Sequence, residues 1–213
     1  MDVPSKLKRM LAPAVYRHPV SSLEPARFYA YLDELQAASR LPGDVLEVGC
    51  YLGGTAALAS KFLVQIGSPR RYLCIDTFGG FVREQFSQDI EKGLPPADRG
   101  MFSGNSHTLA RYLLDRWKAH DVETLQAEIC TIRPELLPEH VAVALIDVDL
   151  AAPITCSLDV IYPRLVNGGV MLVDDCPPST SWAGARPAYL AWVKSNGIEP
   201  EFRYGFGVVR KPA

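Results

Sequence analysis

The chain has 213 residues, of which 48% are hydrophobic and 22% charged, and its formal net charge is −2. This composition is typical of a globular domain, and the near-neutral balance excludes a strongly basic nucleic-acid-binding surface. No apolar run approaches the roughly 18 residues that a membrane-spanning helix requires. The N-terminal stretch carries basic residues without the apolar core of a signal peptide. We therefore expect a cytoplasmic protein with no nucleic-acid or membrane partner.

The five cysteines are scattered along the chain and form no C-x-x-C pair. Such spacing predicts neither a disulfide framework nor a zinc site. We expect free thiols in a reducing compartment, mostly packed as small hydrophobic side chains. They are Cys50, Cys74, Cys130, Cys156 and Cys176.

Short apolar runs alternate with helical stretches along the chain. The amphipathic stretch 21–39 predicts a helix, and the polar region 77–105 predicts a lid or loop with some helix. The segment "EPEFRYGFGVVRKP" predicts a hairpin that turns near Gly205. Strands are predicted at 44–49, 71–76, 122–128, 141–147 and 170–175.

The alternation of strands and helices predicts an α/β fold, a doubly wound, mostly parallel seven-stranded sheet with a C-terminal antiparallel hairpin. We expect an N-terminal helical segment or lid at 1–40. The cofactor-binding domain is expected to follow at 41–213.

Every predicted parallel strand carries an acid at or near its carboxyl end, where open α/β sheets bind their ligands. These acids are Glu47, Asp76, Glu128, Asp147 with Asp149, and Asp174 with Asp175. An acidic edge does not suit a pyrophosphate, and the loop "VGCYLGG" is neither G-x-G-x-x-G nor a P-loop. A cationic cofactor with a free ribose, S-adenosylmethionine, fits better.

The first two strand ends predict how that cofactor is held. Gly49 lets the chain approach the ligand without a side chain, and Asp76 is placed to accept both ribose hydroxyls. Glu47 is expected to help hold the cationic methionine end, and Glu128 lies where adenine is expected.

Four segments together resemble the macrocin O-methyltransferase (TylF-type) family of class I S-adenosylmethionine-dependent methyltransferases. They are "PGDVLEVGCYLGGTAALAS", "YLCIDTFGGF", "VALIDVDL" and "LDVIYPRLVNGGVMLVDDC", within about residues 42–176. With these segments, the expected cofactor-binding residues are Glu47, Gly49, Tyr51, Gly53, Thr55, Asp76, Thr77, Phe78, Glu128 and Asp147.

The resemblance also implies a divalent metal, normally magnesium, at Asp147, Asp174 and Asp175. Three carboxylates without a histidine or thiolate suit Mg²⁺ better than Zn²⁺. An ion there would also offset the repulsion between the two adjacent acids. In this expectation the metal binds and orients the acceptor hydroxyl.

The fourth strand departs from the family pattern D-x-D-x-Y-x-[ST], because Ala151 and Ala152 follow "DVDL". A polar wall of the acceptor pocket is therefore expected to be missing. Leu150 also stands where the catechol-type enzymes have a lysine base.

The candidates for proton transfer are Asp147, then Asp149, with His107 as a further base near the expected lid. Tyr51 and Trp182 are candidates for lining the acceptor pocket.

These patterns predict an O-methyltransferase that acts on a hydroxyl of a small molecule, of the natural-product sugar or polyketide type, and that forms a homo-oligomer. One alternative is an S-adenosylmethionine-binding protein without methyl transfer, either a silent subunit or a non-methylating enzyme, which the Ala151–Ala152 change favours. Another is a nicotinamide-dependent oxidoreductase, which the glycine spacing and the hairpin disfavour.

Overall fold

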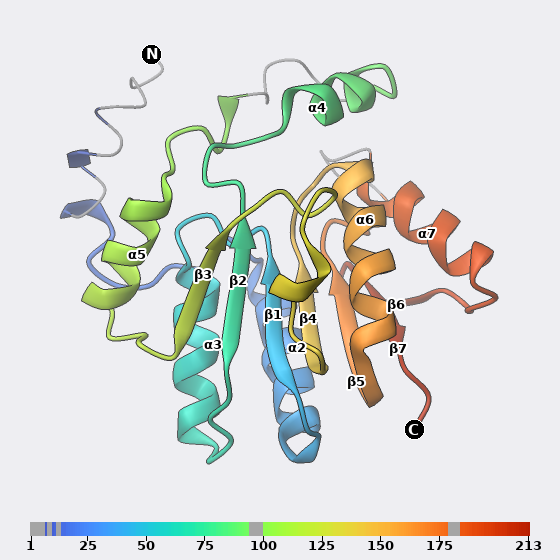
Figure 1. Ribbon diagram of the computed structural model, residues 1–213, viewed down its shortest axis with the longest axis horizontal. Helices are drawn as coiled ribbons and strands as arrows, with labels where there is room; N and C mark the ends of the chain where they lie inside the picture. Colours follow the sequence, from blue (N-terminus) through green and yellow to red (C-terminus); the bar gives the residue numbers. More distant parts are fainter. Residues whose placement is uncertain (1–6, 8–9, 12–13, 94–99, 179–183) are drawn as a thin grey trace.

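The computed structural model describes residues 7, 10–11, 14–93, 100–178 and 184–213. Within them, seven strands form one sheet in the order β3-β2-β1-β4-β5-β7-β6 (Figure 1). β1 to β5 pair in parallel, whereas β7 runs antiparallel to both β5 and β6. The strands are β1 (Asp44–Val48), β2 (Tyr72–Asp76), β3 (Val122–Gln126), β4 (Val141–Ile146), β5 (Leu165–Val173), β6 (Glu201–Arg203) and β7 (Phe206–Arg210). The predicted fold class and the C-terminal hairpin are confirmed.

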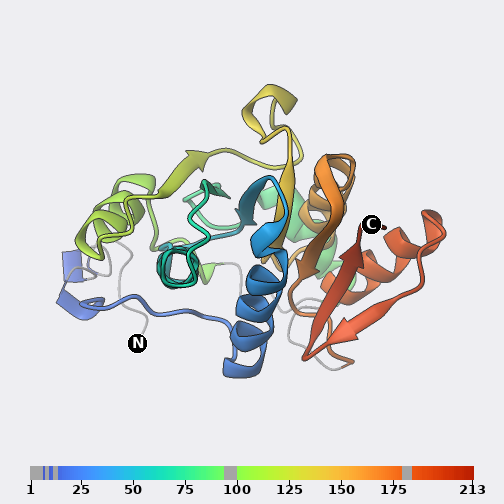
Figure 2. The same cartoon turned by 90° about the horizontal axis from the view of Figure 1, so that it is seen from below.

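Helices cover both faces of the sheet, so that its central strands are buried on both sides. One face carries α2 (Pro25–Ala37), α3 (Gly54–Gln65) and α5 (His107–Arg116), and the other carries α6 (Ala151–Ile161) and α7 (Ala185–Ser195) (Figures 1 and 2). All six residues of β4 are buried, as expected of an unbroken apolar strand in a parallel sheet. Short 3₁₀ turns lie at Ala38–Arg40, Pro134–Leu136 and Tyr162–Arg164.

The carboxyl ends of the parallel strands point toward α4 (Arg83–Ile90), which lies above this edge in Figure 1. This helix belongs to the region that the sequence predicts as a lid with some helix. Whether α4 acts as a lid stays a prediction.

The N-terminal helix α2 packs into the same core as the sheet. Pro25 stands in its first turn, where proline is compatible with a helix. Tyr31 and Leu35 are buried against the strands together with Leu63 of α3. The packing therefore continues across residue 40, where the sequence predicts the end of an N-terminal segment, and the lid role of residues 1–40 stays a prediction.

β5 is longer than predicted, because it begins at Leu165 rather than at Val170. The register with β4 shifts between Val141 and Val143, which is a β-bulge or irregularity. Gly168 has φ +79°, and a Cβ at Gly169 would lie 2.9 Å from the carbonyl oxygen of Val166. The segment "NGG" at residues 167–169 is thus a glycine-dependent irregularity within a strand.

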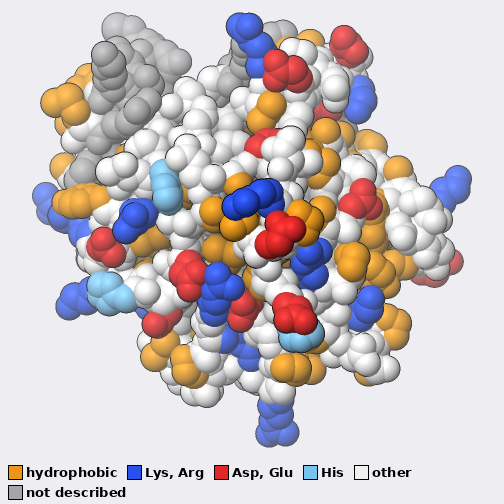
Figure 3. All heavy atoms as spheres, in the orientation of Figure 1, with side chains coloured by type: hydrophobic (Ala, Val, Ile, Leu, Met, Phe, Trp, Pro, Cys, Tyr) orange, Lys and Arg blue, Asp and Glu red, His pale blue; other side chains and the backbone are white. Residues whose placement is uncertain are grey.

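The face seen in Figure 3 carries basic and acidic side chains interspersed, so that neither sign dominates it. In the part of the chain that the structure describes, no helix is both long and apolar enough to cross a bilayer.

Candidate active site

A cavity of about 460 Å³ opens at the carboxyl edge of the sheet. Its walls come from the loop after β1, the ends of β2, β4 and β5, the segment around α4, and Arg27 of α2. The strand-end acids that line it are Asp76, Glu128, Asp147, Asp149, Asp174 and Asp175. The structure therefore brings together the predicted acids of four strands.

Gly49 has no room for a side chain. Its φ is +88°, and a Cβ there would lie 1.9 Å from the carbonyl oxygen of Asp147. The glycine thus lets the loop after β1 pass directly over the end of β4. Because Gly49 also lines the cavity, a ligand can approach bare backbone at this point.

The carboxylate of Asp76 is held at the end of β2 by two backbone donors. Its Oδ2 accepts from the amide of Tyr51 at 2.8 Å, and its Oδ1 accepts from the amide of Phe78 at 2.7 Å. Burial raises the pKa of Asp76, and the hydrogen bonds from the backbone only partly offset this effect. Each carboxylate oxygen keeps acceptor capacity beyond these bonds, as a ribose diol would require.

Glu47 is not among the described residues that line the cavity. It lies within β1 and accepts a short hydrogen bond from the hydroxyl of Tyr72, which is also 2.8 Å from that of Tyr31. Burial raises the pKa of Glu47 to about 8. Its predicted contact with the methionine end of the cofactor has no support in this geometry. The alternation of side chains along a strand accounts for this, since Val48, the next residue, lines the cavity and Glu47 therefore faces the other way.

The remaining cofactor candidates divide into two groups. Tyr51 and Thr77 line the cavity, whereas Gly53 at the start of α3, with φ +78°, does not. The hydroxyl of Thr55 lies 2.8 Å from that of Ser21 beside a smaller hollow, and Phe78 is buried. The direct cofactor contacts predicted for all of these residues stay predictions.

His107, a predicted base, lies at the start of α5 and away from the cavity lining that the structure describes. Its ring stacks on Phe78 with centroids 4.8 Å apart, and its Nε2 lies 2.9 Å from the hydroxyl of Thr124. This environment suits a packed structural histidine. Trp182, predicted to line the acceptor pocket, lies outside the described residues.

Four carboxyl groups lie together where β4 and β5 end. Burial and the neighbouring carboxylates, Asp174 foremost, raise the pKa of Asp147, and burial with Asp175 raises that of Asp149. Burial also raises the pKa of Asp174, to about 6. Asp149 and Asp175 adopt φ values of +62° and +54°, which are costly for residues other than glycine. Such backbone strain is common where side chains are held for function.

Arg27 is the functional candidate that the sequence analysis missed. Its Nη1 donates to Asp174 Oδ1 at 2.5 Å and to Asp175 Oδ1 at 3.0 Å. Only 11% of its side chain is exposed. Among the residues described as lining the cavity, it is the one basic side chain. Its distance in sequence from both acids left no local signal by which it could have been found.

The predicted magnesium ligands do not fit an ion in this arrangement. Carboxylate oxygens are the right donors for Mg²⁺, but an ion requires them to converge at 2.0–2.1 Å. Two of the three expected ligands instead direct an oxygen at Arg27. Within the described residues, no group of three or more Asp, Glu, His or Cys side chains is arranged to hold a metal.

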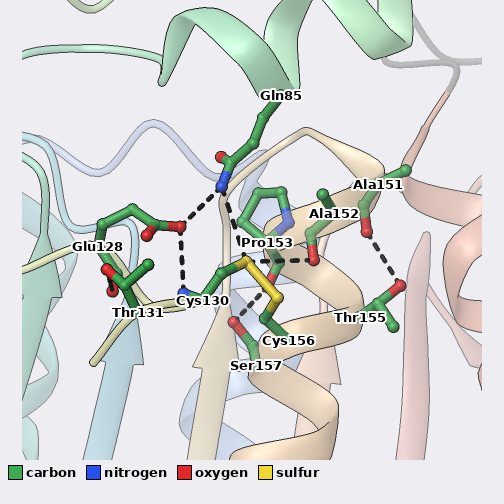
Figure 4. The surroundings of a disulfide bond; sticks show 10 residues. All are labelled: Gln85, Glu128, Cys130, Thr131, Ala151, Ala152, Pro153, Thr155, Cys156 and Ser157. Carbon is green, nitrogen blue, oxygen red and sulfur yellow. Dashed lines mark hydrogen bonds between the residues drawn. A yellow bond between two sulfur atoms is a disulfide. The ribbon is translucent and has the colours of Figure 1, made fainter. Parts of the chain in front are cut away.

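A disulfide lies beside the end of the cavity where adenine is expected. Cys130 and Cys156 are bonded, with Cα atoms 5.1 Å apart, and tie the loop after β3 to α6 (Figure 4). Glu128, two residues beyond β3, accepts from Gln85 Nε2 at 2.7 Å and from the amide of Cys130 at 3.1 Å. The prediction that all the cysteines are free is wrong for this pair. The pair is distant in sequence and becomes adjacent only because the β3 loop folds against α6.

The other three cysteines are buried and free, as expected: Cys50, Cys74 and Cys176.

Fold and site together define a class I methyltransferase, with its antiparallel seventh strand, a glycine turn after β1 and a carboxylate at the end of β2. The sequence matches the family described as macrocin-O-methyltransferase (TylF) over residues 27–202. The chain belongs to this family, and it is an S-adenosylmethionine-dependent O-methyltransferase.

Solved structures share the fold at low sequence identity. The O-methyltransferase NovP has a TM-score of 0.69 and 18% identity, covering 98% of each chain. The calicheamicin methyltransferase CalS11 has the same score and identity, covering 99% of this chain and 94% of its own. TomG from Streptomyces achromogenes, solved with S-adenosylmethionine, has a TM-score of 0.56 and 14% identity, covering 100% and 92%. No curated protein matched the sequence.

Proposed function

We propose that the chain transfers a methyl group to a hydroxyl of a small natural product, of the sugar or polyketide type, within the cavity at the carboxyl edge. The observation that carries this proposal is the position of two sets of groups in one cavity. Gly49 and Asp76 follow β1 and β2, Asp147 and Asp149 follow the neighbouring β4, and all four residues line the cavity. NovP and CalS11, which share the fold, are O-methyltransferases, and CalS11 is described as a TDP-rhamnose 3′-O-methyltransferase. A glycosylated acceptor is therefore the first class to test.

The residues near β1 and β2 bind and orient the cofactor in this proposal. S-adenosylmethionine supplies a methyl group already activated on a sulfonium. The carboxylate of Asp76 accepts hydrogen bonds from the ribose hydroxyls, while the amides of Tyr51 and Phe78 hold this carboxylate in place. Glu128, fixed by Gln85, lies at the adenine end.

The residues at the ends of β4 and β5 act on the acceptor. Asp147, or secondarily Asp149, takes the hydroxyl proton as the oxygen–carbon bond forms and the sulfur–methyl bond breaks. A buried carboxylate whose pKa is raised is suited to this task near neutral pH, because its proton affinity is closer to that required. Orientation of the acceptor supplies most of the remaining rate gain.

Dependence on magnesium stays a prediction. The carboxylate chemistry of Asp147, Asp174 and Asp175 supports the prediction, whereas the contacts of Arg27 with two of these acids oppose it.

Calorimetry with S-adenosylmethionine and detection of S-adenosylhomocysteine test the proposal. The wild-type protein should bind the cofactor, and Asp76→Asn should weaken binding by about 10- to 150-fold, one charge-assisted hydrogen bond being about 1.5–3 kcal/mol. Glu123→Gln, on the neighbouring strand and exposed, should leave binding unchanged.

A panel of glycosylated and polyketide hydroxyl compounds should then yield S-adenosylhomocysteine with at least one member. Cofactor binding without turnover on any of them would favour the alternative, a cofactor-binding protein that does not methylate. Asp147→Asn should abolish turnover.

A further inference from the structure

We infer that Arg27 takes the place of a divalent metal ion in this chain, so that the acid pair at the end of β5 binds no such ion and methyl transfer proceeds without one. The kinetic half of this inference, that methyl transfer proceeds without an ion, rests on the proposed function. The other half, that the acid pair binds no divalent ion, does not rest on it. The observation behind it is a guanidinium nitrogen within hydrogen-bonding distance of one oxygen from each of the two adjacent acids, Asp174 and Asp175.

The contacts of Arg27 are buried and short. The exposed fractions of the three side chains are 11% for Arg27, 8% for Asp174 and 14% for Asp175. A buried, charge-assisted pair of this kind is much less screened than a surface ion pair. Glu24 adds a longer contact of 3.6 Å to Nη2 and is itself exposed.

The helix that carries Arg27 is fixed from both sides. One turn further along α2, Ala30 and Tyr31 are fully buried against the sheet. A Cβ at Gly205, in the turn between β6 and β7, would lie 3.5 Å from Arg27 Nε. Helix and hairpin therefore enclose the arginine stem, and its position follows from the packing of the core.

A metal ion and Arg27 compete for the same oxygens. Magnesium needs carboxylate lone pairs directed at one point, 2.0–2.1 Å away. Asp174 Oδ1 and Asp175 Oδ1 are both directed at Nη1 instead. An ion at this position would lie next to a guanidinium, and displacing that group would leave a buried charge without its partners.

The arginine also performs the electrostatic task that an ion would perform. Asp147, Asp149, Asp174 and Asp175 bring several carboxyl groups to one wall of the cavity. One fixed positive charge at the adjacent pair offsets their repulsion and leaves Asp147 and Asp149 to face the acceptor. Arg27 is thus a positioning residue, acting through the acid pair.

Manganese(II) titration, followed by electron paramagnetic resonance, tests the inference without any acceptor. Wild-type protein should leave millimolar Mn²⁺ unbound. Arg27→Met should gain at least tenfold in Mn²⁺ affinity, and Arg27→Lys, which keeps a cation, should gain none. Adding Asp174→Asn to Arg27→Met should remove the gain.

Arg71→Met is the matched control, because Arg71 also pairs with two carboxylates, at 2.8 Å from Glu123 and 3.3 Å from Asp44, but is exposed and remote from the cavity. It should gain no Mn²⁺ binding. Circular dichroism and cofactor calorimetry establish that each variant is folded.

Wild-type protein that binds Mn²⁺ through Asp174 would overturn the inference, and so would a folded Arg27→Met variant without gain. If that variant does not fold, the wild-type titration decides. Once an acceptor is found, turnover should be the same with and without a chelator, and a tenfold loss with chelator would overturn the kinetic half. A protein that fails to bind S-adenosylmethionine would contradict the proposed function while leaving the manganese result intact.

Discussion

Asp89 Oδ2 accepts a hydrogen bond of 2.8 Å from the backbone amide of Ala151, and this bond joins α4 to the first residue of α6. Leu150, the residue before α6, offers no side-chain cap, so the acceptor comes from another helix. A Cβ at Gly184 would lie only 2.2 Å from this same oxygen. The backbone amide of residue 151, a position where the family commonly has tyrosine, therefore attaches α4 to α6.

We expect Asp89→Ala to loosen α4 over the cavity. The change removes the buried carboxylate that accepts from the amide of Ala151 and leaves that amide unsatisfied at a helix N-terminus. Such a loss costs about 1–2 kcal/mol. Urea denaturation should show that loss, and hydrogen exchange should speed up in α4 and at the amide of Ala151. Glu91→Ala, an exposed acid just after the same helix, is the control. Unchanged exchange at Ala151 would show that the contact does not hold α4.

Gly49→Ala should be far more damaging than the substitution of a glycine with open space at its Cβ position. The new Cβ would lie 1.9 Å from the carbonyl oxygen of Asp147, so the loop after β1 must move. We expect a loss of about 3 kcal/mol or more, together with loss of cofactor binding. Gly67→Ala is the control, because Gly67 has φ +71° but nothing within 4 Å of its Cβ position. It should cost about 1–2 kcal/mol, the backbone strain alone. Equal losses for the two variants, measured by thermal denaturation, would refute the steric argument.

The sequence predicts those parts of the fold and site that depend on local pattern. The apolar run of β4, the glycine at the first turn and the acids at strand ends follow from strand composition and from the rule that ligands bind at carboxyl ends. Glu47 faces Tyr72 inside β1, and its predicted role at the methionine end of the cofactor stays a prediction. Arg27, with its acid partners, and the Cys130–Cys156 pair depend on contacts between distant segments. No spacing rule in a single sequence encodes such contacts.

Reduction of the Cys130–Cys156 disulfide should lower stability and weaken cofactor binding. A cross-link with a sequence separation of 26 is expected to contribute about 3 kcal/mol through the entropy of the unfolded chain. Its loss also frees the loop that carries Glu128, which lines the cavity. The Tm should fall in dithiothreitol and in Cys130→Ser, and calorimetry should show weaker S-adenosylmethionine binding.

Thiol titration in denaturant checks the bond directly, since the chain has five cysteines and the structure leaves Cys50, Cys74 and Cys176 free. Five reactive thiols in the protein isolated without reductant would contradict the disulfide. Cys50→Ser is the control for a cysteine change, because this residue is free and should leave the response to dithiothreitol intact.

Glu34 should make the stability of the protein depend on pH in the acid range. This buried acid of α2 accepts from Arg203 Nη1 at 2.7 Å and from Arg210 Nη1 and Nη2 at 2.9 and 2.7 Å. Burial raises the pKa of Glu34, but the two arginines outweigh it and the net shift is downward. Its ionised form is therefore favoured by folding, and the resulting stability is complete above the unfolded pKa of about 4.3. That stability is lost as the pH falls through the lower folded pKa.

The free energy of unfolding should accordingly fall more steeply between about pH 5 and pH 3 in the wild type than in Glu34→Gln. At neutral pH the variant should be less stable by about 2 kcal/mol, because it loses charge-assisted hydrogen bonds that tie α2 to the C-terminal hairpin. Urea titrations at several pH values measure both effects, with the exposed Glu139→Gln as control. Parallel pH profiles for wild type and Glu34→Gln would mean that the two arginines do not favour the charged form. The loss at neutral pH would then come from packing alone.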